Sequence, residues 1–286
     1  MARQHEEHDD FGGLHRDLRA TWLAEASRRR PGARLDRRSL LGMAARLGVG
    51  LAALPLLGCE NSAAPSEIGG VTTGGTGSTC SSRIPQETAG PYPGDGSNGP
   101  NVLTQSGVVR SDIRSSFAGL NGTADGVPLT IVLTIVSAST CAPLAAQAVY
   151  LWHCDMPGRY SLYSGGVTNQ NYLRGVQAAD ANGRVTFTSI FPGCYAGRWP
   201  HIHFEVYPSL AAATNVANRL ATSQIALPKA ACDQVYAAAG YGSSVTNLSQ
   251  VSLATDNVFS DGSALELATV TGSVAAGLTA ALTVAI

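Results

Sequence analysis

Histidine is scarce in this chain, which has only six histidines among 286 residues. Three lie within the first fifteen residues, His153 stands alone, and His201 and His203 flank a single isoleucine. The chain also lacks any Cys-x-x-Cys sequence, which argues against a cysteine-rich zinc site. A metal site in this chain would therefore depend on few imidazoles, and two of these lie together.

Basic charge is lacking beyond the N-terminal segment, and so is a long apolar run. Residues 1–58 carry a net charge of +3, whereas residues 59–286 carry −4. No basic face is left for a nucleic acid, so we exclude that partner. The most apolar run, residues 40–58, is short for a membrane span and is interrupted by Arg46 and Pro55.

The apolar run fits an export signal better. Arg37 and Arg38 precede it, which favours the twin-arginine route. It ends in Leu-Leu-Gly-Cys, and Cys59 there resembles the lipidated cysteine of bacterial lipoproteins. We expect an exported protein at the periplasm or cell surface, which contacts the membrane through a lipid anchor at Cys59. The alternative is a buried helix followed by an ordinary cysteine.

The composition divides the chain into three parts. Residues 1–58 form the signal segment, residues 59–82 a flexible linker rich in Gly, Ser and Thr, and residues 83–286 one domain. About 200 residues suffice for a domain with its own core.

Five cysteines follow Cys59, and in an exported protein they can form disulfides. An odd number leaves at least one cysteine free or paired between chains. We expect two bridges, with the pairing left open, among Cys80, Cys141, Cys154 and Cys232.

The domain is predicted to be all-β, an antiparallel β-sandwich with few short helices. Alternating β-branched and aromatic residues, separated by Gly, Pro and Asn, predict strands. These segments are residues 129–138, 147–154, 183–191, 201–208 and 223–228, with two closing strands in residues 265–286. Residues 229–240 are predicted to form one short helix.

The strand prediction gives the histidine pair a geometry. Residues two apart on a strand point to the same side, so His201 and His203 share a face and Ile202 points to the other. Two imidazoles on one face can begin a transition-metal site. Taken alone, a solvated or hydrogen-bonded pair explains the pattern as well.

Two tyrosines strengthen the metal interpretation. Tyr195 lies six residues before His201, and Tyr160 lies in a turn that follows a predicted strand. A phenol has a pKa of about 10, so only a strongly Lewis-acidic ion holds it deprotonated at neutral pH. Ferric iron suits two phenolates and two imidazoles, so we expect Fe(3+) as the cofactor.

Three longer motifs carry a family resemblance. The first is "PQETAGPYPGD" from Pro85, which is similar to T-x-G-P-Y-Y. The second is "AVYLWHCDMPGRY", which matches V-x-x-W-H-x-x-x-x-G-x-Y and ends at Tyr160. The third, "NYLRGVQAADANGRVTFTSIFPGCYAGRWPHIHFEV", contains P-x-x-Y-x-x-R-x-x-H-I-H. Over residues 83–230 the chain resembles the intradiol ring-cleavage dioxygenases, non-haem Fe(III) enzymes that act on catechols.

The resemblance implies a ligand set and a catalytic arginine. The implied iron ligands are Tyr160, Tyr195, His201 and His203, with Tyr195 and His203 axial. Tyr163 is a rival to Tyr160, but Tyr160 has the family spacing of eight residues after Trp152. Arg198 matches the family's active-site arginine, and its alternative interpretation is a surface cation. The catalytic pair implied is thus Arg198 and Tyr195.

The resemblance also implies the reaction. A catechol-type substrate and O2 would give a cis,cis-muconate, with both oxygen atoms in the product and no external reductant. Tyr92, Gln177 and Arg198 are the expected substrate contacts, and Arg174 joins Gln177 as a supporting donor. For Tyr92 the alternative is packing in a turn, and for Gln177 and Arg174 it is solvation. His153 is expected to hydrogen-bond near the metal without binding it.

Other functions remain open at the level of sequence. A cell-surface β-sandwich that holds iron or catecholates without turnover would use the same ligands, and a purely structural surface domain is a third possibility. Catechol 1,2-dioxygenases carry a helical N-terminal dimerisation region, and residues 59–83 contain no such segment. The sequence leaves the oligomeric state and the particular catechol undetermined.

Overall fold

The computed structural model of the chain describes residues 82–286. The predictions for the export signal, for the linker and for lipidation of Cys59 lie outside the described residues.

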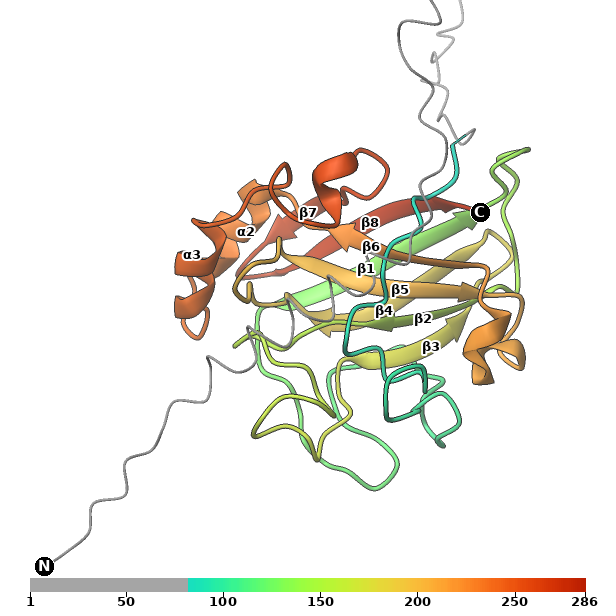
Figure 1. The fold of residues 1–286 in the computed structure, drawn as a ribbon, viewed down its shortest axis with the longest axis horizontal. Helices are drawn as coiled ribbons and strands as arrows, with labels where there is room; N and C mark the ends of the chain where they lie inside the picture. Colours follow the sequence, from blue (N-terminus) through green and yellow to red (C-terminus); the bar gives the residue numbers. More distant parts are fainter. Residues whose placement is uncertain (1–81) are drawn as a thin grey trace, which may run out of the picture. The chain divides into compact units, whose positions relative to one another are not determined.

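The described residues form two four-stranded sheets (Figure 1). One has the order β4-β1-β8-β7 and the other the order β3-β2-β5-β6. The neighbouring strands within each sheet are antiparallel, except for the parallel pair β1 and β8. The strands are β1 Pro128–Val136, β2 Ala148–Trp152, β3 Arg174–Ala178, β4 Arg184–Ile190, β5 His201–Tyr207, β6 Ala221–Ala226, β7 Thr269–Ser273 and β8 Gly277–Ala285. The all-β sandwich predicted from the sequence is confirmed.

Strand patterns explain the two sheets. In β4, buried Val185 and Phe187 alternate with exposed threonines, as expected for a strand with one solvated face. In β5, every residue is buried. Ile202 and Phe204 point to one face of that strand, and the histidines point to the other. Protein therefore covers both faces of β5, which gives the histidine face a dry environment.

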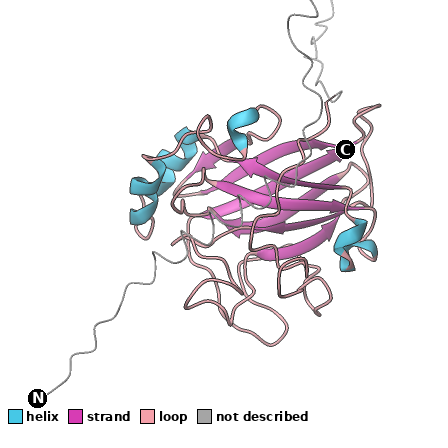
Figure 2. Ribbon diagram, in the orientation of Figure 1, coloured by secondary structure: helices cyan, strands magenta, loops and turns pink. Residues whose placement is uncertain are grey.

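The helices are short and lie at the ends of the sheets (Figure 2). They are α2 Lys229–Tyr236, α3 Gly242–Leu248 and the 3₁₀ turns Ala212–Thr214, Val216–Asn218 and Phe259–Asp261. None of the helices in residues 82–286 has the length and apolar character needed to cross a bilayer. The sequence predicted α2 but not α3, whose composition of Gly, Ser, Thr and Asn has low intrinsic helix propensity.

Strand β3 is not among the strands predicted from the sequence, where Arg174 and Gln177 were expected to be supporting donors or solvated. The segment pairs with β2 along its whole length, and Val109 forms a bridge to Val176 on its other side. Only five residues long and interrupted by Gly175, the strand has too little alternation to be recognised from the sequence.

The cysteine prediction needs a correction. Cys154 and Cys232 are free and buried, so the expected pair of bridges involving both is wrong. Burial raises the pKa of each thiol well above its usual value, which keeps them as protonated core side chains. Cys194 is free as well. Cys80 lies outside the described residues, and a bridge that uses Cys141 stays a prediction.

Candidate functional site

Strand register places the two histidines in the middle of a sheet face. His203 lies opposite Trp152 of β2 and opposite Gln224 of β6, so all three side chains share this face. His201 lies two residues earlier on the same face, and both imidazoles are buried. The predicted geometry of the pair is confirmed.

The ring of His201 is fixed by the backbone just before β5. Its Nδ1 donates a hydrogen bond to the carbonyl of Trp199, at 2.5 Å. With the proton held at Nδ1, the Nε2 atom carries a lone pair. That atom lies 3.1 Å from Nε2 of His203.

The ring of His203 is fixed by stacking. It lies parallel to Trp152, with ring centroids 4.9 Å apart and an interplanar angle of 4°. The backbone of Gly90 covers its edge, and a Cβ at this glycine would lie 3.4 Å from Cε1 of His203. The φ angle of Gly90 is +69°, which favours glycine here. Residues 85–95, which we call the entry segment, therefore pack directly on one of the predicted ligands.

Both predicted tyrosine ligands point at the same imidazole nitrogen. The hydroxyl of Tyr195 lies 3.2 Å from Nε2 of His201, and that of Tyr160 lies 3.4 Å from the same atom. The two tyrosines come from loops that touch through their backbones, since Gly193 donates to the carbonyl of Asp155 at 3.1 Å. Four side chains from two loops and one strand thus converge on one point. We call these side chains, Tyr160, Tyr195, His201 and His203, the convergent group.

Helix α3 holds the loop of Tyr195 from outside. The Cys194 amide donates to Ser244 Oγ at 2.9 Å, and Asn247 Nδ2 donates to the Cys194 carbonyl at 2.8 Å. Both backbone groups of the residue before Tyr195 are therefore tied to this helix.

Burial makes the four groups neutral in the metal-free chain. It lowers the pKa of His201 and His203 well below the usual value, helped at His201 by the charge of Arg198 and at His203 by His201. Burial raises the pKa of Tyr160 and Tyr195 well above that of a free phenol. The site thus presents two neutral imidazoles and two neutral phenols. The phenols would ionise only beside a strong positive charge.

Tyr163, the rival to Tyr160, has its hydroxyl elsewhere. The hydroxyl donates to the carbonyl of Asn98 at 2.8 Å and accepts from the amide of Gly94 at 2.9 Å. Tyr163 therefore supports the loop around residues 94–98.

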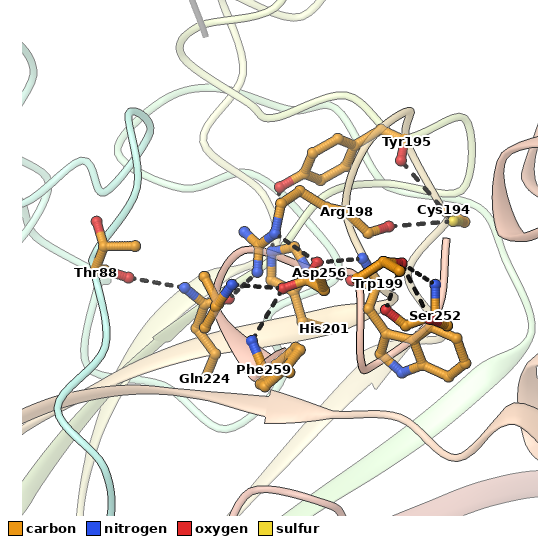
Figure 3. Close-up of polar contacts among 12 residues, drawn as sticks. Thr88, Cys194, Tyr195, Arg198, Trp199, His201, Gln224, Ser252, Asp256 and Phe259 are labelled. Atoms are coloured by element: carbon orange, nitrogen blue, oxygen red, sulfur yellow. Dashed lines mark hydrogen bonds and ion pairs between the residues drawn. The ribbon is translucent and has the colours of Figure 1, made fainter. Parts of the chain in front are cut away.

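Arg198 is buried, so the alternative interpretation as a surface cation is wrong. Its Nε donates to Asp256 at 2.9 Å, and its Nη2 donates to Oε1 of Gln224 at 2.7 Å. Burial alone would lower its pKa, but the carboxylate of Asp256, together with Tyr195 when that phenol is ionised, raises it overall. Figure 3 shows the guanidinium between Gln224 and Asp256, with the hydroxyl of Tyr195 directed to the same region. A permanent positive charge therefore lies beside the convergent group.

Arg174 is a structural clamp, because its buried guanidinium donates to five oxygens. The acceptors belong to Tyr92, Pro93, Tyr150 and Ser161. It joins the entry segment and the loop after Tyr160 to the sheet. The alternative of a solvated Arg174 is wrong.

The remaining predicted residues lie in two different environments. The ring of half-buried Tyr92 lies 5.1 Å from that of Tyr160, beside the convergent group. Gln177 lies on the opposite face of the sheet from Arg174, and its amide donates to the carbonyl of Thr186 in β4. Its position gives no support to the predicted substrate contact. His153 hydrogen-bonds to Cys154 O and Ser189 Oγ, both at 2.7 Å.

Sequence reasoning missed two residues of the site, Gln224 and Asp256. Gln224 lies in a segment predicted as a strand, and pairing of that strand with β5 would have placed it beside His203. Asp256 lies in an irregular stretch after α3 and carries no signal of its own in the sequence.

The convergent group fits a ferric ion by its donor chemistry. In residues 82–286 no cluster of three or more His, Cys, Asp or Glu could hold a metal, so a metal site depends on the tyrosines. Two imidazole nitrogens and two potential phenolates would give a trivalent cation two negative charges and two neutral donors. His203 Nδ1 is buried without a hydrogen-bond partner, so only its Nε2 is directed into the group.

Comparison with known proteins identifies similar sequences and folds. Residues 99–221 match the protein-family model Dioxygenase_C, described as dioxygenase. An intradiol ring-cleavage dioxygenase from Tetranychus urticae has a similar fold, with a TM-score of 0.57 and 24% sequence identity. The match covers 72% of this chain and 94% of that chain. The chain therefore shares the fold of an intradiol ring-cleavage dioxygenase, and residues 99–221 match a dioxygenase family model.

Two other solved structures are less similar to this chain. The 3-chlorocatechol 1,2-dioxygenase from Rhodococcus opacus 1CP has a TM-score of 0.44 and 17% identity, over 70% of this chain and 71% of that chain. The catechol 1,2-dioxygenase from Pseudomonas arvilla C-1 has a TM-score of 0.43 and 18% identity, over 71% and 62%. No curated protein matches the chain.

Proposed function

We propose that this chain is a non-haem Fe(III) intradiol dioxygenase that cleaves catechol-type aromatics with O2 to cis,cis-muconate-type products. One observation carries the proposal. The hydroxyls of Tyr160 and Tyr195 and Nε2 of His203 all lie within 3.4 Å of Nε2 of His201, in a buried site beside Arg198.

The four convergent side chains would hold the iron. His201 and His203 would bind through Nε2, because Trp199 holds the proton of His201 at Nδ1. Tyr160 and Tyr195 would bind as phenolates. A bound ferric ion would supply the Lewis acidity that keeps both phenols ionised and draws electron density from a chelated catechol.

Tyr195 is suited to accept a proton from the substrate. It is only half-buried, whereas Tyr160 is 2% exposed, so Tyr195 is the phenol with room to move. Burial favours its neutral form strongly, so Tyr195 Oη as a phenolate would readily accept a proton from a catechol hydroxyl. The site then needs no separate strong base to bind catechol as a dianion.

Arg198 would stabilise negative charge on the substrate. Its guanidinium is held by Asp256 and Gln224, so little reorganisation is needed when charge develops. Trp152, Tyr92 and the backbone of Gly90 surround the histidines and would exclude water from the ring.

Oxygen uptake with a panel of catechols, measured together with the visible spectrum, tests the proposal. A ferric bis-tyrosinate site absorbs visible light, so the purified protein should be wine-red, change colour with catechol and consume one O2 per ring cleaved. A coloured protein that binds catechol without oxygen uptake supports the alternative of a cell-surface iron- or catecholate-binding sandwich. A protein that stays colourless after ferrous loading in air contradicts both.

We also propose that the enzyme is exported and lipid-anchored at Cys59, as the order of Arg37, Arg38, the apolar run and Cys59 indicates. Fractionation of cells that express wild type and Cys59→Ala tests this proposal. The wild type should be in the membrane fraction and the variant in the soluble exported fraction. Equal distribution of the two proteins contradicts the anchor.

A further inference from the structure

Asp256 makes several contacts in addition to its ion pair with Arg198. Its carboxylate is fully buried, although it lies in an irregular segment between α3 and the last 3₁₀ turn. Oδ1 accepts from the amides of Val258 at 2.9 Å and Phe259 at 3.2 Å. Oδ2 accepts from Arg198 Nε at 2.9 Å and from the Trp199 amide at 2.7 Å. Three backbone amides therefore fix this carboxylate before it meets the arginine.

Arg198 is hydrogen-bonded on two edges of its planar guanidinium. Asp256 binds Nε, and Gln224 binds Nη2 at 2.7 Å. Gln224 is itself fixed, because its Nε2 donates to the carbonyl of Thr88 at 2.9 Å. Two contacts on different edges of a rigid fork determine the plane and direction of the charge. Figure 3 shows these contacts as one connected network.

The Asp256 contact also reaches the metal ligands through the backbone. It binds the amide of Trp199, and the carbonyl of the same residue accepts from His201 Nδ1. The segment that carries both Arg198 and His201 is thus attached at one carboxylate. That carboxylate lies beyond residue 221, where the family match ends.

We propose that Asp256 is a positioning residue that aims the guanidinium of Arg198 at the substrate side of the iron site. The inference rests on the proposed function for its catalytic consequence, and on the contacts alone for its geometry. A buried arginine needs a counter-charge, and removing one partner of such a pair leaves the other uncompensated. Without Asp256, Arg198 Nε loses its acceptor, and the guanidinium leaves the position in which it would meet the substrate.

Two variants separate the positioning role from loss of folding. Asp256→Asn removes the charge. Asp256→Ser keeps an oxygen that can accept from the amides of Val258 and Phe259, but that oxygen does not reach Arg198. The matched control is Asp261→Asn, the same change at an exposed carboxyl of the same segment, outside the network.

Kinetics give the first readout. We expect both Asp256 variants to lower kcat by roughly 10–100-fold, because a misplacement of about 1 Å has effects of this size. KM, iron content and the colour of the resting enzyme should change little, and Asp261→Asn should match wild type. The double variant Arg198→Lys with Asp256→Ser should be no slower than Arg198→Lys alone, because both changes remove one aimed charge. Additive losses, or wild-type kcat in both Asp256 variants, overturn the inference.

Crystal structures of the purified wild type and Asp256→Ser give a readout that needs no turnover. The guanidinium of Arg198 should leave its wild-type position in the variant, by about 1 Å or more. An unmoved guanidinium refutes the positioning role. If wild type consumes no O2 with any catechol, the proposed function fails, and the two structures still decide the role of Asp256.

Discussion

Two tyrosines three residues apart, Tyr160 and Tyr163, have different surroundings. The hydroxyl of Tyr160 faces the histidines, whereas that of Tyr163 is bound to backbone groups at residues 94 and 98. The spacing from Trp152 favoured Tyr160 in the sequence, and the geometry agrees with that choice.

Tyr160→Phe should weaken iron retention by more than about 100-fold, because it removes a proposed direct ligand, and loss of a supporting partner alone costs 10–100-fold. Tyr163→Phe is the matched control and should keep the iron and the colour. Iron content and visible spectra after dialysis against a chelator measure the difference. Equal iron loss in the two variants means that the ligand is assigned to the wrong tyrosine.

Glu266 is a buried carboxyl whose Oε1 accepts from Ser223 at 3.2 Å and whose Oε2 has no hydrogen-bond partner. Burial raises its pKa to about 8. The folded state therefore binds a proton that the unfolded state releases between pH of about 4.5 and 8. The free energy of unfolding falls as pH rises through this window, because the folded state must ionise a buried group.

Glu266→Gln should remove this part of the pH dependence, about 2–4 kcal/mol between pH 5 and pH 9. Urea unfolding at a series of pH values measures it. The variant and wild type should be equally stable near pH 5, where both side chains are neutral, and should diverge above pH 7. Parallel curves across the whole range would show that Glu266 ionises normally.

The four convergent side chains could be selected from the sequence, because a short spacing on one strand and two turn positions specify them. His201 and His203 needed only the period of a strand. Asp256 could not be predicted, because its contact with Arg198 joins residues 58 positions apart, and nothing in its own neighbourhood marks it.

At the scale of elements, the loops that carry Tyr160 and Tyr195 are packed backbone to backbone. A Cβ at Gly193 would lie 2.3 Å from the carbonyl oxygen of Met156, so no side chain fits there. Glycine is also needed at Gly158, where φ is +90° and a Cβ would lie 3.2 Å from Cβ of Tyr195. The distance between the two phenols is thus set by glycines.

Gly193→Ala should push these loops apart. We expect a loss of about 1–3 kcal/mol in the free energy of unfolding and weaker iron retention. Gly165→Ala is the matched control, since a Cβ there meets nothing within 4 Å. Thermal unfolding and iron content of both variants provide the test, and a Gly193→Ala protein that equals its control would contradict the packing argument.

Most strands could be predicted because their alternating patterns are long enough to recognise. Strand β3 and helix α3 could not be predicted, because neither has a clear local pattern. Tertiary pairing with β2 imposes the strand on a short segment, and α3 forms in a sequence of weak helix formers. The contacts of α3 with Cys194 therefore could not be predicted from helix propensity.

For the whole molecule, the proposed iron site joins distant parts of the chain. The entry segment at Gly90, β2, β5, β6 and the stretch at Asp256 all contact it. A group that binds only the folded arrangement stabilises the whole domain by linkage.

Removal of iron should therefore lower the Tm of the domain by roughly 10 °C, taking about 4 kcal/mol for a ligand present at 1,000 times its Kd. Calorimetry before and after chelation, with reloading by ferrous iron in air as the control, measures the change. An unchanged Tm would mean that the metal binds the folded and unfolded chains equally.

The parallel pairing of β1 with β8 has a consequence for synthesis. Leu129 and Leu278 are partners, so a central pair of one sheet joins segments about 150 residues apart. At about 5–20 residues per second, the ribosome takes roughly 10–30 s to produce the partner of β1. During that time the nascent strand has an open edge that can pair wrongly, so the sandwich closes only late in translation or after it.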